Sequence, residues 1–151
     1  MNTEIRKNSA EDYETAYMLT RELMAHHNAL DIFTTTPERL RELIESGMLK
    51  SYTLYCDKNP AGVMNFFFKL TTFTGRKILY IEDLYVREEY RGKGLGKNLL
   101  TKAREVAKEN DCEQLELKCA HWNNKSAEFY KAMGMKNENE WITFTLDKAL
   151  F

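Results

Sequence analysis

Residues 91–97 read Arg-Gly-Lys-Gly-Leu-Gly-Lys and hold three glycines within five positions, shortly after the apolar run of residues 78–86. Glycine loses more backbone entropy on folding than any other residue, so such a cluster needs a specific reason. The start of a helix carries unpaired N–H groups and a partial positive charge, and glycine lets these groups approach an anion closely. The segment is therefore predicted to hold a phosphate group at the start of a helix.

Two common nucleotide-binding motifs do not fit this segment. A P-loop requires G-x-x-x-x-G-K-[ST], but Gly96 and Lys97 are followed by Asn98, and no glycine stands at position 91. A dinucleotide fingerprint counted from Gly92 requires a glycine at position 97, where this chain has lysine. The pattern that fits is R-x-x-G-x-G, and the simpler alternative is a turn that only joins a strand to a helix.

The elements around this segment follow from the apolar periodicity and from the capping residues. A first strand is expected at residues 3–7, and a capping box of Ser9 and Asp12 introduces a helix that runs to about Asn28. Thr36 and Pro37 open a second helix, which Gly47 ends. Further strands are expected at residues 51–56, 62–70, 78–86, 113–119 and 141–146, and further helices at 94–110 and 124–133. This order predicts a single mixed α/β domain over residues 1–151, with a central mixed sheet flanked by helices.

The composition is that of a globular domain and points away from two classes of partner. Hydrophobic residues make up 43% of the 151 residues and charged residues 30%, with a formal net charge of −1. The near-zero charge argues against nucleic acid, and no apolar run approaches the roughly 20 residues of a membrane helix. The polar residues 1–8 do not resemble a signal peptide, and three cysteines at no metal-ligand spacing indicate reduced thiols. A cytoplasmic protein without a bound metal is expected.

Four stretches together resemble one family. These are the R-x-x-G-x-G segment, "LYIEDLYV" before it, "NNKSAEFYKAMGM" after the next strand, and "EWITFTLDK" near the end. The chain resembles the GCN5-related N-acetyltransferase (GNAT) superfamily, and within it the diamine acetyltransferases. The resemblance covers about residues 62–148 and implies the GNAT fold, with acetyl-coenzyme A as the co-substrate and a small primary amine as the acceptor.

The resemblance also implies roles for individual residues. Glu82 would accept the proton of the attacking amine through a water, and Tyr130 would protonate the departing thiolate. A proton acceptor is needed because an alkylamine of pKa about 10.4 is neutral in roughly one molecule per thousand at pH 7. Cofactor-binding residues by resemblance are Leu84, Tyr85, Val86, Arg91, Gly92, Lys93, Gly94, Leu95, Gly96, Lys97, Asn123, Asn124, Ser126 and Tyr130. The alternative without a catalytic role is that Glu82 and Asp83 are solvated carboxylates and that Tyr130 packs in the core beside Phe129.

The amine itself is less well defined by the sequence. Candidate substrate-binding residues are Glu82, Asp83, His26, His27, His121 and Trp141. Where polyamine-acetylating members place acids and aromatics, this chain has Thr72, Thr74, His26 and His27, so a short or amino-acid-like amine is favoured over a long polyamine. The alternatives within reach are a protein N-acetyltransferase and a non-catalytic acyl-CoA-binding regulatory module.

A homodimer built partly by residues 141–151 is a further expectation. This stretch, "WITFTLDKALF", is rich in apolar side chains, and an exposed edge strand of that kind is an aggregation hazard unless it is paired or covered.

Overall fold

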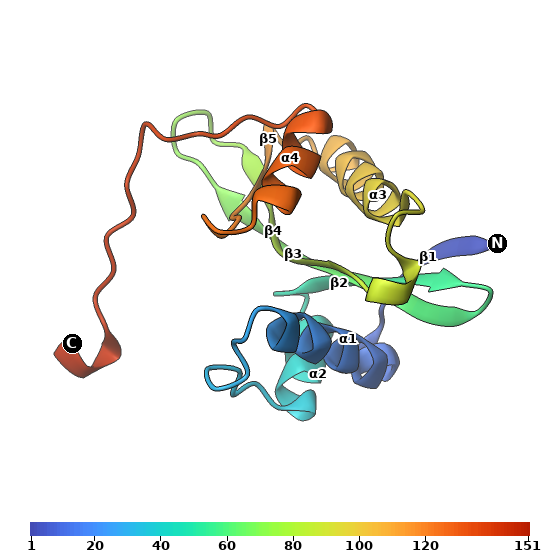
Figure 1. Cartoon of the computed structure of the whole chain (residues 1–151). Helices are drawn as coiled ribbons and strands as arrows, with labels where there is room; N and C mark the ends of the chain where they lie inside the picture. Colours follow the sequence, from blue (N-terminus) through green and yellow to red (C-terminus); the bar gives the residue numbers. More distant parts are fainter. The chain divides into compact units, whose positions relative to one another are not determined.

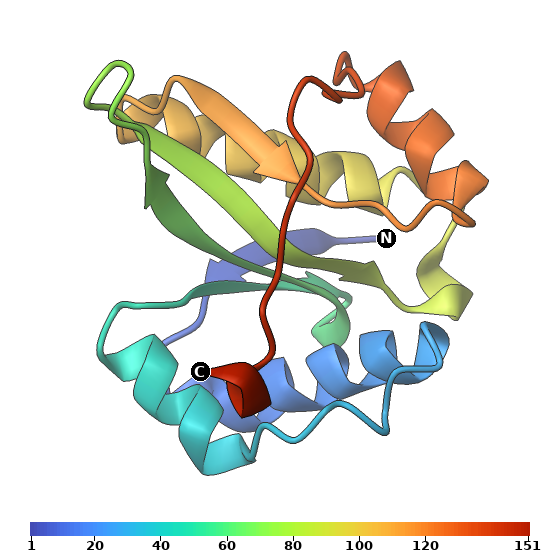
Figure 2. The ribbon, with the colours of Figure 1, turned by 90° about the vertical axis from the view of Figure 1, so that its left-hand side faces the viewer.

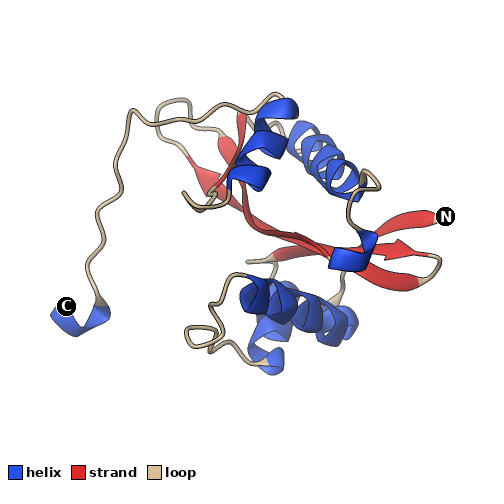
Figure 3. Ribbon diagram, in the orientation of Figure 1, coloured by secondary structure: helices blue, strands red, loops and turns tan.

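The computed structural model describes residues 1–151, which form two compact units, Met1–Lys118 and Cys119–Phe151 (Figures 1 and 3). The strands of the first unit are β1 (Thr3–Lys7), β2 (Lys50–Cys56), β3 (Asn59–Leu70), β4 (Lys77–Val86) and β5 (Gln114–Leu117). Its helices are η1 (Ala10–Asp12), α1 (Tyr13–His26), α2 (Pro37–Glu45), η2 (Glu88–Tyr90) and α3 (Leu95–Glu109). The second unit contains α4 (Asn124–Ala132) and the short η3 (Lys148–Leu150).

The first unit is built on one mixed sheet with the strand order β1-β2-β3-β4-β5. The first three neighbouring pairs are antiparallel, and β4 pairs with β5 in parallel across the connection through α3. Helices α1 and α2 cover one face of the sheet and α3 covers the other (Figure 1). The expected mixed α/β class is thereby confirmed.

Helix α3 shows how directly the sequence pattern sets the packing. Its apolar residues recur every three or four positions, so that they share one face of the helix. All six residues of this apolar stripe are buried: Leu95, Leu99, Leu100, Ala103, Val106 and Ala107. The helix therefore packs onto the sheet with its glycine-rich start at the end of β4.

The first two helices also begin as their capping residues predict. The backbone N–H of Ser9 donates to Asp12 Oδ2 at 2.7 Å, which completes the expected capping box ahead of α1. Thr36 Oγ1 accepts from the backbone N–H of Arg39 at 3.1 Å, with Pro37 in the first turn of α2. Helix α1 ends at His26, two residues earlier than expected, and Asn28 then takes a left-handed φ of 52°.

The hairpin between β2 and β3 is tighter than the sequence suggested. Asp57 and Lys58 both have positive φ, at 46° and 70°, and they form a two-residue turn of the kind that suits the twist of paired strands. Strand β3 therefore begins at Asn59 rather than at Gly62. Pro60, which has no N–H to donate, is accommodated by a register shift between Leu54 and Tyr55 on the partner strand.

The predicted last strand at residues 141–146 is wrong. These residues form no strand, and the second unit contains no other strand that could pair with them. A strand is stable only when its N–H and C=O groups find a partner chain, so alternating apolar residues alone do not make one. The side chains of Trp141, Ile142 and Phe144 are instead 74%, 77% and 86% exposed.

Candidate functional site

Strand β4 has two differently paired halves. Its first half pairs on both edges, because β5 pairs in parallel with Ile78 through Ile81 and no further. Beyond that point β4 runs on past the end of β5 (Figure 2), and Leu84, Tyr85 and Val86 pair only with β3. The other edge of these three residues therefore carries backbone N–H and C=O groups that no strand of the first unit takes up.

A β-bulge marks the boundary between the two halves. Asn65 pairs with Asp83 and Phe66 pairs with Ile81, so Glu82 is an extra residue in β4. A bulge bends the strand locally and leaves the extra residue outside the regular pairing. Glu82 is exposed, whereas Asp83 keeps only 7% of its side-chain surface.

The buried carboxyl group of Asp83 has an unusual pKa. Burial raises this pKa from the ordinary value of 3.8 to about 6. A hydrogen bond from Asn65 Nδ2 to Asp83 Oδ2, 2.9 Å long, acts in the opposite direction, and the nearby charge of Glu82 raises the pKa again. Asp83 is thus still mainly ionised at pH 7, next to a second carboxylate.

The glycine-rich segment forms an open cradle at the start of α3. Gly92 and Gly94 have φ of 76° and 77°, a left-handed conformation that glycine adopts without strain, and Gly94 is the N-cap of α3. A Cβ atom built on either glycine would meet no other atom within 4 Å, and the first turn of α3 contains no acidic residue. The space beside Gly92 and Gly94 is therefore open, and no acidic side chain of the first turn offsets the positive field of the helix start.

Two arginines fix the chain on the β4 side of this cradle. Arg87 donates to both carboxylate oxygens of Glu22 on α1, at 2.9 and 2.7 Å, and to the backbone carbonyl of Pro60 at 2.9 Å. Arg91 donates through Nε to the backbone carbonyl of Val86 at 2.8 Å, and its guanidinium lies 5.7 Å from the centre of the Tyr85 ring. Sequence reasoning missed Arg87 and Glu22, because nothing local connects two residues that lie 65 positions apart.

The two adjacent histidines lie at the end of α1. Both are exposed, and their ring centres are 5.7 Å apart with 41° between the planes. The pKa of His27 is lowered, first by burial and then by the neighbouring His26. A neutral His27 side chain is therefore favoured near neutral pH.

In the second unit, the predicted cofactor residues gather at the start of α4. Asn123 is the N-cap, and its side-chain oxygen accepts from the backbone N–H of Ser126 at 3.1 Å. Asn124 is the first residue of the helix and is exposed. The capping bond gives Asn123 a structural role, independent of any ligand.

Tyr130 lies in the last turn of α4 and is half-buried. Its ring packs beside the ring of Phe129, with 5.3 Å between the ring centres. Burial, with a smaller contribution from Cys119, raises the pKa of Tyr130 to about 12. The phenol is therefore protonated throughout the neutral and mildly alkaline range. The two remaining predicted substrate residues of this unit, His121 and Trp141, are exposed.

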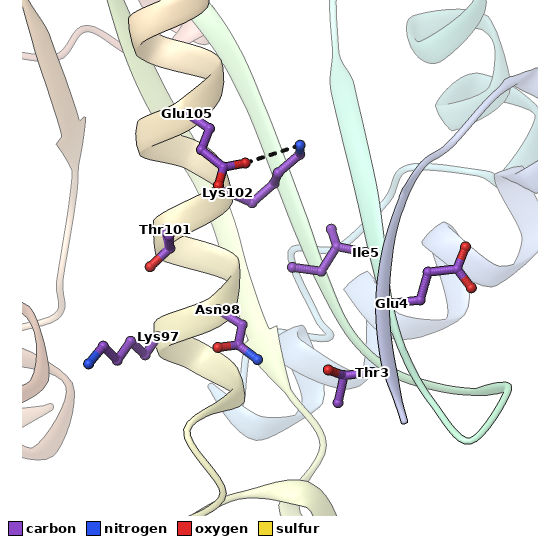
Figure 4. Close-up of a pocket in the computed structure, with 8 residues that line it drawn as sticks. All are labelled: Thr3, Glu4, Ile5, Lys97, Asn98, Thr101, Lys102 and Glu105. Atoms are coloured by element: carbon purple, nitrogen blue, oxygen red, sulfur yellow. Dashed lines mark hydrogen bonds and ion pairs between the residues drawn. The ribbon is translucent and has the colours of Figure 1, made fainter. Parts of the chain in front are cut away.

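A separate surface pocket of about 330 Å³ lies between β1 and α3 (Figure 4). Asn98 of α3 and Ile5 of β1 face each other across it, while Lys97 points away from the strand. Of the predicted site residues only Lys97 lines it; the full set is Thr3, Glu4, Ile5, Lys97, Asn98, Thr101, Lys102 and Glu105. This pocket is therefore distinct from the β4 edge and from the glycine cradle.

Two further features of the molecule bear on the sequence-based expectations. The structure brings together no group of three or more His, Cys, Asp or Glu side chains in a metal-binding arrangement. None of its helices combines the length and the apolar composition that crossing a bilayer requires.

Comparison with known proteins identifies the family of the chain. The family model described as "Acetyltransferase (GNAT) family" matches residues 13–135, which include strands β2 to β5, the glycine cradle and α4. The chain therefore belongs to the GNAT acetyltransferase family, as its resemblance to that family predicted.

Individual relatives are acetyltransferases by name. Thialysine N-epsilon-acetyltransferase of Caenorhabditis elegans is 28% identical over 151 residues, which cover 98% of this chain and 94% of the relative. The protein of the same name from Bos taurus is 41% identical over 85 residues, 54% of this chain and 49% of the relative. The matched region thus spans about half the length of that relative.

Solved structures share the fold. An aminoglycoside acetyltransferase from an uncultured soil metagenomic sample, solved in complex with sisomicin, superposes with a TM-score of 0.83. The match covers 96% of this chain and 95% of that chain at 16% identity, which shows a common fold.

Proposed function

We propose that the chain is an N-acetyltransferase that transfers the acetyl group of acetyl-coenzyme A to the primary amine of a small molecule. The observation that carries this proposal is the unpaired edge of β4 running directly into the open glycine cradle of α3. An extended amide-containing arm can pair with such an edge as an added strand would. A pyrophosphate suits the N–H groups at the start of the helix.

The chain's own residues would then share the chemistry of amide formation. The amine nitrogen attacks the thioester carbon, the carbon–sulfur bond breaks, and the sulfur leaves as a thiolate. The exposed Glu82 carboxylate at the bulge is the proposed acceptor of the amine proton, through a water. The phenol of Tyr130 is the proposed donor to the thiolate, and its protonated state at neutral pH supports that role.

The raised pKa of Tyr130 makes its proposed role more specific. A phenol of pKa about 12 is a weaker acid than an ordinary thiol of pKa about 8.5. Complete proton transfer from the phenol to the thiolate is therefore uphill. Tyr130 is accordingly proposed to stabilise the departing thiolate by a short-lived hydrogen bond, while water supplies the proton in the end.

The acceptor amine is proposed to be short and to resemble a basic amino acid. Two relatives, named for thialysine and for L-ornithine, support this substrate class. The carboxylates of Glu82 and Asp83 would attract the cationic groups of such a substrate. His26, His27, His121 and Trp141 stay proposed substrate contacts.

A thiol-release assay with acetyl-coenzyme A against amino acids, diamines, polyamines, aminoglycosides and peptides tests the proposal. Turnover of basic amino acids or short diamines supports it, whereas turnover of peptide N-termini alone would favour a protein N-acetyltransferase. Tyr130→Phe should lower kcat by about 10²–10³-fold, as expected for the loss of one donor to the developing negative charge, with little change in KM for acetyl-coenzyme A. Glu82→Gln should shift or remove the acidic limb of the pH–rate profile. Binding of coenzyme A without any turnover would indicate a regulatory module instead.

The second unit suggests that the protein acts as a homodimer. Trp141, Ile142, Phe144, Leu146, Leu150 and Phe151 are all more than 60% exposed, which is a large apolar surface for one short segment. We propose that residues 141–151 gain a strand partner in a second copy. Light scattering at tens of micromolar should report the dimer mass, and a monomer would contradict this. A cytoplasmic location and one GNAT domain over residues 1–151 also stay predictions.

A further inference from the structure

A continuous line of buried polar side chains crosses the sheet of the first unit. It starts beside the end of β1, crosses β2 and β3, and ends on β4, on the face that α1 covers. Its members are Asn8, Thr53, Ser51, Asn65 and Asp83, which are 4%, 0%, 1%, 0% and 7% exposed. Burying five polar side chains in one row costs free energy unless each is hydrogen-bonded, so the row needs an explanation.

Each member of the line is hydrogen-bonded to the next. Thr53 Oγ1 donates to Asn8 Oδ1 at 3.0 Å, and Asn8 Nδ2 donates to Ser51 Oγ at 2.8 Å. Ser51 Oγ donates to Asn65 Oδ1 at 2.7 Å, and Asn65 Nδ2 donates to Asp83 Oδ2 at 2.9 Å. The line is thus a single chain of four hydrogen bonds with Asp83 at its end.

The direction of every bond in this chain follows from the carboxylate. An ionised carboxylate only accepts, so Asn65 must turn its NH₂ group toward Asp83. Its carbonyl oxygen must then accept from Ser51, whose oxygen in turn accepts from Asn8. All four bonds therefore donate toward Asp83, and aligned hydrogen bonds of this kind strengthen one another.

The second oxygen of the Asp83 carboxylate, Oδ1, is the one left for a ligand. The bond from Asn65 occupies Oδ2. No buried side-chain oxygen or nitrogen of the structure lacks a hydrogen-bond partner. Asp83 is only 7% exposed as a residue, but Oδ1, which takes no part in the bond to Asn65, is not completely enclosed. The accessible oxygen lies one residue from the exposed Glu82, at the start of the unpaired edge of β4.

We propose that Asn65 is a positioning residue for Asp83, and that the hydrogen-bond chain behind it holds this carboxylate to bind a second cationic group of the amine substrate. The inference rests on the proposed acetyltransferase function and deepens it. A substrate with two ammonium groups would keep one of them on Asp83 while the other, deprotonated, attacks the thioester. The hydrogen-bond chain thus favours substrates with a second ammonium group, such as diamines and basic amino acids, over simple amines.

The surroundings of Asp83 leave few other groups that could perform this task. Glu82 is the charged neighbour that acts on it, and Tyr80 is the nearby titratable group on the same strand. Asn65 from β3 and Thr20 from α1 are uncharged. Asn65 Nδ2 also donates to Thr20 Oγ1 at 2.9 Å, and that bond branches away from Asp83 because Thr20 donates onward to the backbone carbonyl of Ala16.

This branch supplies a matched control for the experiment. Asn65→Leu removes the bond to Asp83 together with the bonds of Asn65 to Ser51 and Thr20. Thr20→Val leaves the bond to Asp83 in place and removes the other bond of the same NH₂ group, together with the bond from Thr20 to the Ala16 carbonyl. Ser51→Ala is a milder variant that breaks the chain one bond further back. L-Ornithine and 5-aminopentanoate are the substrate probes, since they differ only in the second ammonium group.

In the wild-type protein, kcat/KM should be higher for L-ornithine than for 5-aminopentanoate. Asn65→Leu should reduce that preference about tenfold, through KM rather than kcat, because a hydrogen bond to a charged group is lost. Ser51→Ala should reduce it less, and Thr20→Val should keep the wild-type ratio. The affinity for coenzyme A should be unchanged in all three.

A second measurement separates this inference from the proposed function. The carboxyl carbon of Asp83, assigned in ¹³C-aspartate-labelled protein with Asp83→Asn, can be titrated by NMR without any substrate. Asn65→Leu should raise its pKa and Thr20→Val should not. If no amine is turned over, the proposed function fails and the NMR titration alone decides the positioning role. A wild-type titration of Asp83 in folded Asn65→Leu overturns the inference, as does an unchanged ornithine preference in an active variant.

Discussion

The two halves of β4 differ in pairing, in burial and in chemistry. The first half, up to Ile81, is hydrogen-bonded on both edges, and Ile78, Leu79, Tyr80 and Ile81 are all buried. The second half, from the bulge at Glu82, is paired on one edge only and contains two adjacent carboxylates. The first half holds the fold together, whereas the second half carries groups that reduce stability and offer themselves to ligands.

The largest expected change in the free energy of unfolding comes from a substitution in the first half of β4. Leu79 is fully buried on a strand that is paired on both edges, so Leu79→Ala should lower the free energy of unfolding by about 2–5 kcal/mol. Leu84→Ala, in the half-buried second half, should cost less. Urea unfolding at pH 7 measures both. Equal losses at the two positions would remove the contrast between the halves.

Removing the buried charge of the second half, by Asp83→Asn, should change the free energy of unfolding with the opposite sign to Leu79→Ala. The pKa of Asp83 is raised by burial from 3.8 to about 6, so the folded protein binds this proton more tightly than the unfolded chain does. Stability due to Asp83 is therefore full below pH 4 and is lost as pH rises through 6. Relative to Asp83→Asn, the wild type should lose about 2–3 kcal/mol of unfolding free energy between pH 4 and pH 7.

Urea unfolding of both proteins at several pH values across this window measures the difference. Other carboxylates titrate in both proteins and cancel when the two curves are subtracted. A difference that stays constant with pH would mean that Asp83 is not a buried charge.

The glycine cradle follows the second half of β4. A glycine inside it can be compared with a glycine outside it that has a similar backbone conformation. Gly94 and Gly75 have φ of 77° and 69°, and a Cβ on either meets no atom within 4 Å. Alanine at each position should therefore cost a similar ~1–2 kcal/mol of unfolding free energy. Only Gly94→Ala should weaken coenzyme A binding in calorimetry, because Gly75 lies in the turn between β3 and β4. Equal affinities of the two variants would argue against the cradle as the phosphate site.

The smallest expected effect concerns the end of β4, where Arg87 binds Glu22. Arg87→Lys keeps the charge but loses the two-pronged contact and the bond to the carbonyl of Pro60. A loss of about 1 kcal/mol in unfolding free energy is expected. KM for acetyl-coenzyme A should rise slightly, since the chain leading into the cradle is held less firmly. An unchanged KM would show that the cradle does not depend on this anchor.

Much of the fold was open to prediction because it depends on nearest neighbours along the chain. The six buried residues of α3, the Thr36–Pro37 start of α2 and the Ser9–Asp12 capping box all follow from helix periodicity and from local hydrogen bonds. The strand at residues 141–146 could not be judged in this way. Its alternating pattern was genuine, but a strand also needs a partner, and the pattern does not show whether one exists.

The sequence by itself determined where the glycines, the apolar faces and the candidate acid and base stand along the chain. Only the tertiary structure decided that β4 bulges at Glu82, that β5 stops pairing at Ile81, and that Asp83 is buried behind Asn65. The physical reason is that register and burial depend on pairs of residues far apart in sequence. Asn65 and Asp83 are 18 positions apart and Asn8 and Ser51 are 43 apart, and no local pattern brings them together.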